Sequence, residues 1–238
     1  MSVEVCEVEF GQNTITFDLV RRERKTLSIS VHPDLAVEVF APIDATFDKI
    51  AEKVRKRAPW IQKQLKYFAQ FQPRTPKRSY VAGETHLYLG RQYKLKVAPH
   101  IQNSVKMFRG QIMVNSTKPR SKEHTRELVR DWMLKRARIK FAERLEICRG
   151  RFADPEAVVP TGLVIRDLSQ RWGSMTARGN LVLNRSLIGA ATDSIDYVIT
   201  HELCHIEHPH HGTAFFEHLG RVMPDWERRK TKLERQLA

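Results

Sequence analysis

Residues 193–206, DSIDYVITHELCHI, are the stretch that decides how the last third of this chain folds. The apolar residues Ile195, Ile199, Leu203 and Ile206 recur in it at spacings of four, four and three. This spacing is typical of an amphipathic helix that presents one apolar face to a core. The sequence therefore predicts a helix here, with its polar residues gathered on the neighbouring face.

That polar face carries His201, Glu202 and His205, which form the pattern H-E-x-x-H. Residues four apart on a helix lie nearly above one another, so the two imidazoles can hold one metal ion. Glu202 lies beside both and can take a proton from metal-bound water. The alternative is an unrelated pair of histidines on an ordinary helix, and the further histidines that follow weaken it. The pattern indicates a hydrolytic metal site.

The ends of the helix are also predicted. Asp193 or Ser194 is the expected N-cap, because short polar side chains accept hydrogen bonds from the free N–H groups of a first helical turn. Pro209 is the expected end, since proline disfavours the helical conformation in the residue before it. Gly212 then allows the chain to turn back towards the histidine pair.

A catalytic zinc site needs a third protein ligand. His208 lies seven residues after His201, a rise of about 10 Å along a helix, which is too far for two ligands of one ion unless the helix ends. His210 and His211 follow Pro209, where a turn can bring either one to the metal. An acidic third ligand is the alternative, with candidates Glu217, Asp225 and Glu227.

The charge of the chain is unusual. Its 238 residues include 41 Lys and Arg against 27 Asp and Glu, a formal net charge of +14. Such an excess favours polyanionic partners such as nucleic acid or nucleotides. The alternative is a protein that is simply basic, and the spread of the cations over several helices weakens the case for a dedicated binding site.

The compartment is predicted from what the sequence lacks. No stretch approaches the ~20 apolar residues of a membrane span, so no membrane partner is expected. Residues 1–5 show neither the basic nor the apolar region of a signal peptide. The three cysteines, Cys6, Cys148 and Cys204, are odd in number and widely spaced, unlike a disulfide framework. We therefore expect a reducing, cytoplasmic location.

Residues 1–72 are predicted to form β-hairpins and helices. A helix is expected to carry Phe47 and Val54, to be interrupted at Pro59, and to be followed by a second helix from Trp60. Residues 72–78, which are basic and contain prolines, are the expected connector. Alternating apolar residues predict the strands and their turn: residues 15–19, 27–31 and 37–39, with the turn at His32-Pro33-Asp34.

Residues 79–120 are predicted to be a second β region, and residues 121–238 a domain that contains the motif helix. The latter starts with a helix to about Gly150, continues with short strands at 163–165 and 181–183, and ends in a charged tail from Trp226. No internal repeat is evident. The fold class is therefore α+β, with a β-rich N-terminal region followed by a domain of helices and a small sheet.

The chain resembles the YgjP-like metallopeptidase family, which is related to the SprT-like and WLM zinc proteases. The resemblance is strongest over residues 160–227 and weaker over most of the rest. Two departures are Met175, where the family often has cysteine, and His208, where metzincins have glycine. These segments carry the resemblance: RWGS at 171–174, GNLVLN at 179–184, DYVITHELCH at 196–205, His211, FF at 215–216, and earlier GE at 83–84 and LGRQY at 89–93.

The resemblance implies a zincin-like domain with one Zn²⁺ ion, or another divalent metal, on His201, His205 and His211. It implies Glu202 as general base and a peptide or protein substrate. The strand with Leu181 and Leu183 is implied to be the edge strand that holds an extended substrate. Arg171 and Trp172 are candidate substrate contacts, although a structural salt bridge for Arg171 and core packing for Trp172 weigh more.

Three functions compete at this point. The first is a zinc metallopeptidase that cleaves peptide bonds. The second is a metal-dependent phosphohydrolase that acts on nucleotides, which the positive charge would attract. The third is a nucleic-acid-associated protein with a structural zinc, which would require four protein ligands and no open position.

Overall fold

The protein, described here as a computed structural model, has the predicted α+β class. The structure describes residues 3–32, 34–70, 72, 78–168 and 171–237, so Pro33 of the predicted turn and residues 73–77 of the predicted connector lie outside it. The chain divides into two compact units, residues 1–75 and residues 76–237. The second unit contains both the β region 79–120 and the motif helix.

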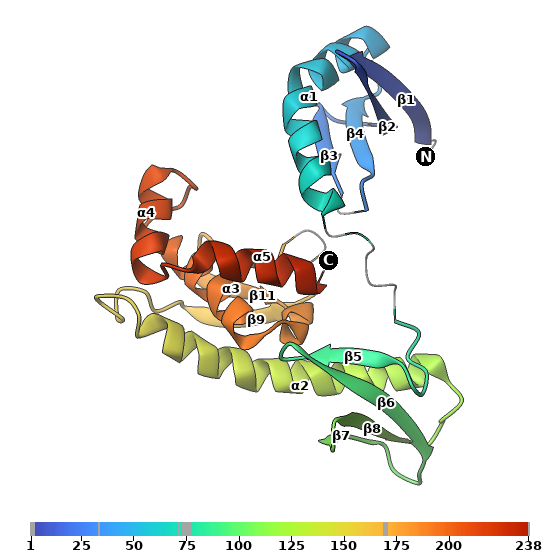
Figure 1. The fold of residues 1–238 in the computed structure, drawn as a ribbon, viewed down its shortest axis with the longest axis vertical. Helices are drawn as coiled ribbons and strands as arrows, with labels where there is room; N and C mark the ends of the chain where they lie inside the picture. Colours follow the sequence, from blue (N-terminus) through green and yellow to red (C-terminus); the bar gives the residue numbers. More distant parts are fainter. Residues whose placement is uncertain (1–2, 33, 71, 73–77, 169–170, 238) are drawn as a thin grey trace. The chain divides into compact units, whose positions relative to one another are not determined.

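The first unit is a four-stranded sheet with one long helix packed on it (Figure 1). Strands pair in the order β1-β2-β4-β3, with antiparallel outer pairs and a parallel central pair. Alternate residues such as Ile15, Phe17 and Leu19 are buried under the helix, as the period of two predicts. The strands are β1 (Val3–Phe10), β2 (Asn13–Arg22), β3 (Ser28–Val31) and β4 (Val37–Pro42).

Helix α1 (Phe47–Ala69) passes through Pro59 without a break, so the predicted interruption and the second helix from Trp60 are wrong. A proline inside a helix removes one backbone hydrogen bond and crowds the preceding turn. Here Val54 and Ile61, on either side of Pro59, are both fully buried in the same core. That shared packing holds both halves on one helical axis.

The second unit begins with a sheet that repeats the topology of the first. Its order is β5-β6-β8-β7, again with two antiparallel pairs joined by a parallel central pair, and again a long helix follows. This repeat is not evident in the sequence. The elements are β5 (Thr85–Tyr88), β6 (Arg91–Pro99), β7 (Ser104–Phe108), β8 (Gln111–Ser116) and α2 (Lys122–Arg149).

A three-stranded sheet, a 3₁₀ helix and three further α-helices complete this unit (Figure 1). The strand order is β10-β11-β9, so β11 is the central strand and β10 is an edge strand. The last helix replaces the predicted charged tail. The elements are β9 (Gly162–Arg166), β10 (Gly173–Met175), β11 (Asn180–Asn184), the 3₁₀ helix η1 (Arg185–Gly189), α3 (Thr192–Cys204), α4 (Thr213–Val222) and α5 (Trp226–Leu237).

The prediction that Leu181 and Leu183 lie on the edge strand is therefore wrong. Both are fully buried in β11, which pairs with β9 on one side and β10 on the other. A central strand has no free backbone groups to offer a substrate, because both of its edges are already paired. The strand GSM at residues 173–175, which the sequence left unassigned, takes the edge position.

Helix α3 is fixed by a buried ionic network. Asp196 is almost fully buried, and both of its oxygens accept hydrogen bonds from Arg144 of α2, each at 2.7 Å. Arg151 adds a third bond at 2.8 Å. The guanidinium of Arg229 on α5 lies 3.8 Å away. These contacts attach α3 to two other helices and so fix the helix that carries the motif.

The remaining sequence predictions concern membranes and cysteines. Within the described residues, the structure has no helix with the length and apolar character needed to cross a bilayer. Cys6, Cys148 and Cys204 are all buried and free.

Candidate metal centre

The motif lies at the C-terminal end of α3. Both ends of this helix differ from the predicted ones. The N-cap is Ala191, whereas Asp193 lies in the first turn and pairs with Lys232 at 2.8 Å. The helix ends at Cys204, with His205 as C-cap, five residues before Pro209. The backbone leaves the helix early enough for the following loop, residues 206–212, to turn back beside it.

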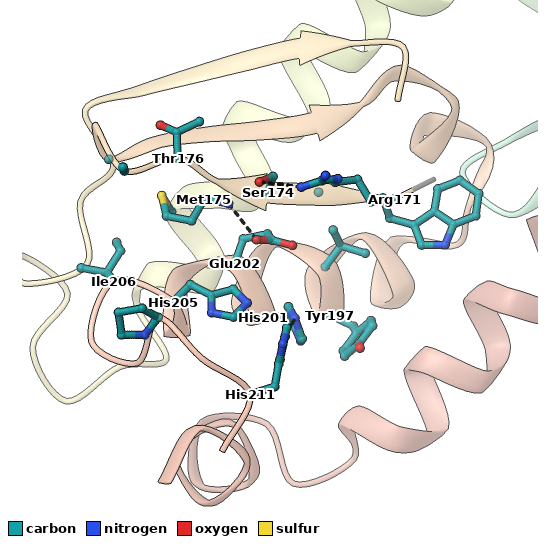
Figure 2. A pocket seen from close by; sticks show the side chains of 16 residues that line it. Arg171, Ser174, Met175, Thr176, Tyr197, His201, Glu202, His205, Ile206 and His211 are labelled. Carbon is teal, nitrogen blue, oxygen red and sulfur yellow. Dashed lines mark hydrogen bonds between the residues drawn. The ribbon is translucent and has the colours of Figure 1, made fainter. Parts of the chain in front are cut away.

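Three imidazoles converge at this end of the helix (Figure 2). The Nε2 atoms of His201 and His211 are 2.9 Å apart, and one ring nitrogen from each of His201, His205 and His211 lies within 4.8 Å of the others. The alternative third ligands His210, Glu217, Asp225 and Glu227 do not belong to this group, and Asp225 is paired with arginines of α5. The predicted set of three histidines is therefore brought together by the fold.

The environment favours the neutral form of His201 and of His211. Burial, together with the smaller effects of His205, His211 and Lys230, lowers the pKa of His201 to about 3. Burial also lowers the pKa of His211, with His205 and Lys230 acting in the same direction. Neutral imidazoles retain the lone pair that a metal ligand must offer. The cluster is thus prepared for a cation rather than for protons.

His205 is oriented by the loop. Its Nδ1 lies 3.0 Å from the backbone carbonyl oxygen of His208, a distance at which Nδ1–H donates to that oxygen. The proton is then on Nδ1, and the lone pair of Nε2 is free for the cluster. Backbone carbonyls often fix metal-ligating histidines in this way.

Phe215 of α4 supports all three rings. It is fully buried, and its ring centroid lies 4.9 Å from that of His201, 4.6 Å from that of His205 and 4.7 Å from that of His211. The sequence indicated Phe215 only as part of the family resemblance. Its position on the apolar face of α4, next to the histidine loop, is the only signal of its role that the sequence contains.

Glu202 lies between the histidines and β10 (Figure 2). Its side chain is 7% exposed, and Oε2 accepts a hydrogen bond from the backbone N–H of Met175 at 2.9 Å. Burial raises the pKa of Glu202 to about 7, although the Met175 N–H and the charge of Arg171 pull it down. A carboxyl group poised near neutrality can both accept and donate a proton.

Glycine at position 173 makes room for this carboxylate. A Cβ atom at Gly173 would lie 2.8 Å from Cγ and 3.0 Å from Oε1 of Glu202, and 3.0 Å from a methyl group of Val198. These distances are shorter than side chains tolerate without moving. This contact is not predictable from the sequence, because it joins two residues of β10 and α3 that are 29 positions apart.

The cluster opens into a cleft of about 940 Å³. Arg171 is exposed at its margin and bonds weakly to Ser174 at 3.4 Å, and within the described residues it has no ion-pair partner. Trp172 is half-buried and packs against the core. Leu181 and Leu183 do not reach the cleft. Arg171, Trp172, Ser174, Met175, Tyr197 and Ile206 line it together with the metal-motif residues.

The model of the YgjP-like, metallopeptidase domain matches residues 25–236. The chain belongs to the YgjP-like family. The family resemblance seen in the sequence is confirmed, and the match extends through both units. It makes the chain a hydrolase of the metal-dependent protease type, with a metal cofactor and a peptide or protein substrate. A comparison with curated proteins found no match.

Proposed function

We propose that the protein is a zinc metallopeptidase in which His201, His205 and His211 hold one ion and Glu202 is the general base. The observation that supports this most directly is the convergence of three imidazole rings beside a buried carboxylate at an open cleft. Three nitrogen ligands with a free fourth position are the typical donor set of catalytic zinc. Other divalent metals can occupy such a set.

The roles follow from the positions of the side chains. A bound zinc ion supplies Lewis acidity at neutral pH, which is the chemistry that peptide hydrolysis needs. Glu202 accepts a proton from the attacking water and returns it to the leaving amine. The Met175 N–H holds Oε2 of Glu202, and Oε1 lies beside Gly173 of the same strand. The low exposure of Glu202 strengthens these polar contacts.

The exposed edge of β10 is the proposed place for the substrate backbone. The backbone hydrogen-bonding groups of Trp172 and Thr176 face β11. The C=O of Trp172 accepts from the N–H of Asn184, and the N–H of Thr176 donates to the C=O of Asn180. The backbone groups of the alternate residues Gly173 and Met175 therefore point away from β11. Because the Met175 N–H is already donated to Glu202, pairing with a substrate falls to the other outward groups of these two residues. An extended peptide can add there as a further antiparallel strand. This assignment replaces the predicted one at Leu181 and Leu183.

The histidine cluster argues against the structural-zinc alternative. A structural zinc site is closed by four protein ligands. Among the described residues, the group around His201 contains three ligands and lies against a cleft. Cys204, the nearest thiol in sequence, is fully buried in the core. Phosphohydrolysis, the other alternative, is tested against peptide cleavage in the experiment that follows.

The proposal is tested by incubating the zinc-loaded, full-length protein with unfolded casein and, separately, with nucleoside triphosphates. We expect new amino termini from casein that disappear when a chelator removes the metal and return when zinc is restored. Release of phosphate without cleavage of casein would instead assign the site to nucleotides. A protein with zinc bound and neither activity would contradict both hydrolytic functions.

A further inference from the structure

A second group of metal-ligating side chains lies outside the cleft. Glu207 and His208 belong to the loop between α3 and α4, and His218 lies on α4. Oε2 of Glu207 is 3.1 Å from Nδ1 of His218 and 4.0 Å from Nε2 of His208. One ligand atom from each of the three lies within 4.8 Å of the other two. Nothing in the proposed mechanism uses these residues.

The spacing suits a metal ion. Zinc binds nitrogen and oxygen ligands at about 2.0–2.2 Å, so the ligand atoms of a tetrahedral site are about 3.3 Å apart. The distances from Oε2 of Glu207 to the ring nitrogens of His218 and His208, 3.1 Å and 4.0 Å, lie on either side of that value. Two imidazoles and one carboxylate select zinc and similar transition metals over Mg²⁺ and Ca²⁺, which prefer oxygen ligands.

The group has a buried side and an open side. The side chain of His218 is 12% exposed and lies against the buried ring of Phe152, with centroids 5.6 Å apart. The side chains of His208 and Glu207 are 30% and 45% exposed. A cation could thus enter from solvent, and water could complete its coordination. An ion pair between Glu207 and His218 would account for one distance, but not for the approach of His208.

His208 connects this group to the first cluster. Its carbonyl oxygen receives the Nδ1–H of His205, while its own ring, 5.3 Å from that of His218, faces the second group. Its backbone N–H also donates to the carbonyl of Cys204, the last residue of α3. Fixing the His208 side chain would therefore fix the backbone that orients His205.

We propose that Glu207, His208 and His218 form a second, peripheral site for zinc or a similar transition-metal cation, which ties the loop after α3 to α4 and steadies His205. This site is separate from the proposed catalytic one, and it can exist whether or not the protein is a peptidase. Its occupancy orders the loop that carries His211.

The test counts metal ions. The full-length protein is stripped with a chelator, titrated calorimetrically with Zn²⁺, and its bound zinc is measured by elemental analysis after gel filtration. We expect two ions per chain in the wild type, one in His218→Ala, one in His201→Ala, and none in the double variant. His210→Ala, which removes an exposed histidine of the same loop that belongs to neither group, should retain two.

The single variants separate the two sites. One ion in the wild type that is lost in His201→Ala, or two ions retained in His218→Ala, would overturn the second site without affecting the first. Circular dichroism shows whether each variant is folded, and Glu207→Gln, a nearly isosteric change on the open side, provides a second variant that should also lose one ion.

Hydrogen exchange tests the effect on the loop. In the wild type, the second equivalent of Zn²⁺ should slow exchange of the amides of residues 205–212, and in His218→Ala it should not. Equal protection in both proteins would show that the loop is ordered by the first ion alone, and would overturn the proposed link to His205.

Discussion

The backbone N–H of Met175 on β10 donates a hydrogen bond to Oε2 of Glu202 on α3, at 2.9 Å. This contact joins the exposed edge strand to the carboxylate of the H-E-x-x-H motif. Because the same strand offers its outer edge to the cleft, substrate pairing and the position of the proposed base depend on one short segment of backbone.

Gly173→Ala should disturb this arrangement while leaving the metal in place. The new Cβ would lie 2.8 Å from Cγ of Glu202, and displacement of a catalytic group by about 1 Å can cost on the order of 10²-fold in rate. We expect kcat to fall by about that factor, with zinc content unchanged. Gly220→Ala on α4, where the Cβ would meet nothing within 4 Å, is the matched control. Full activity in Gly173→Ala would refute the contact.

Glu202→Gln should retain zinc and lose activity. The glutamine keeps the size of the side chain and an oxygen that can accept the Met175 N–H, but it cannot accept the proton of water. General acid–base catalysis contributes typically 10²–10⁴-fold, so a loss in that range is expected in casein cleavage. Glu217→Gln, an exposed glutamate of α4, should remain active. A metal-replete, active Glu202→Gln protein would remove Glu202 from the mechanism.

His211→Ala and His210→Ala should differ sharply. His211 places Nε2 at 2.9 Å from that of His201, whereas its neighbour His210 is exposed and belongs to neither histidine group. Losing one of three ligands should weaken zinc binding by orders of magnitude and abolish activity. A competition assay with a chromophoric chelator measures the affinity of both variants. Equal affinities would mean that the third ligand is a different residue.

The sequence could predict α3 because its apolar period is strong and the motif is local. It could also predict the meeting of His211 with His201, since the family resemblance and a loop of limited length left few choices. It could not predict β10, because three residues are too few to show a period of two. The same limit explains the error at Leu181 and Leu183. The sequence shows clearly that these residues form a strand, but it does not show that a strand lies on each side of it.

Other differences arise from tertiary packing. Pro59 predicts a break, but buried residues on both sides keep α1 continuous. Helix α5 is so rich in charge that it resembles a tail, and Leu233 is its one buried residue within the described part of the chain. The two four-stranded sheets share only their strand order. The sequences of residues 3–42 and 85–116 show no visible similarity that would predict it.

Acidification should destabilise the second unit through His86. This side chain is buried, which lowers its pKa below 6.5, and the attraction of Glu84 offsets that only partly. The unfolded chain therefore binds the proton more readily, and stability is lost as the pH falls below about 6.5. With zinc saturating, His86→Gln should show a smaller decrease in denaturant midpoint between pH 7 and pH 5.5 than the wild type. An identical decrease would contradict the role of His86.

Asp196→Asn should unfold more easily than any comparable surface variant. The carboxylate of Asp196 is 4% exposed and bonded to Arg144 and Arg151, so its loss leaves two partly buried cations without this partner. Breaking such a pair typically costs about 3–5 kcal/mol. Asp167→Asn is the control, because Asp167 also pairs with two arginines but is 62% exposed, where the loss should be within about 1 kcal/mol. Urea unfolding of both variants measures the difference, and similar losses would show that the network around α3 contributes no more than a surface ion pair.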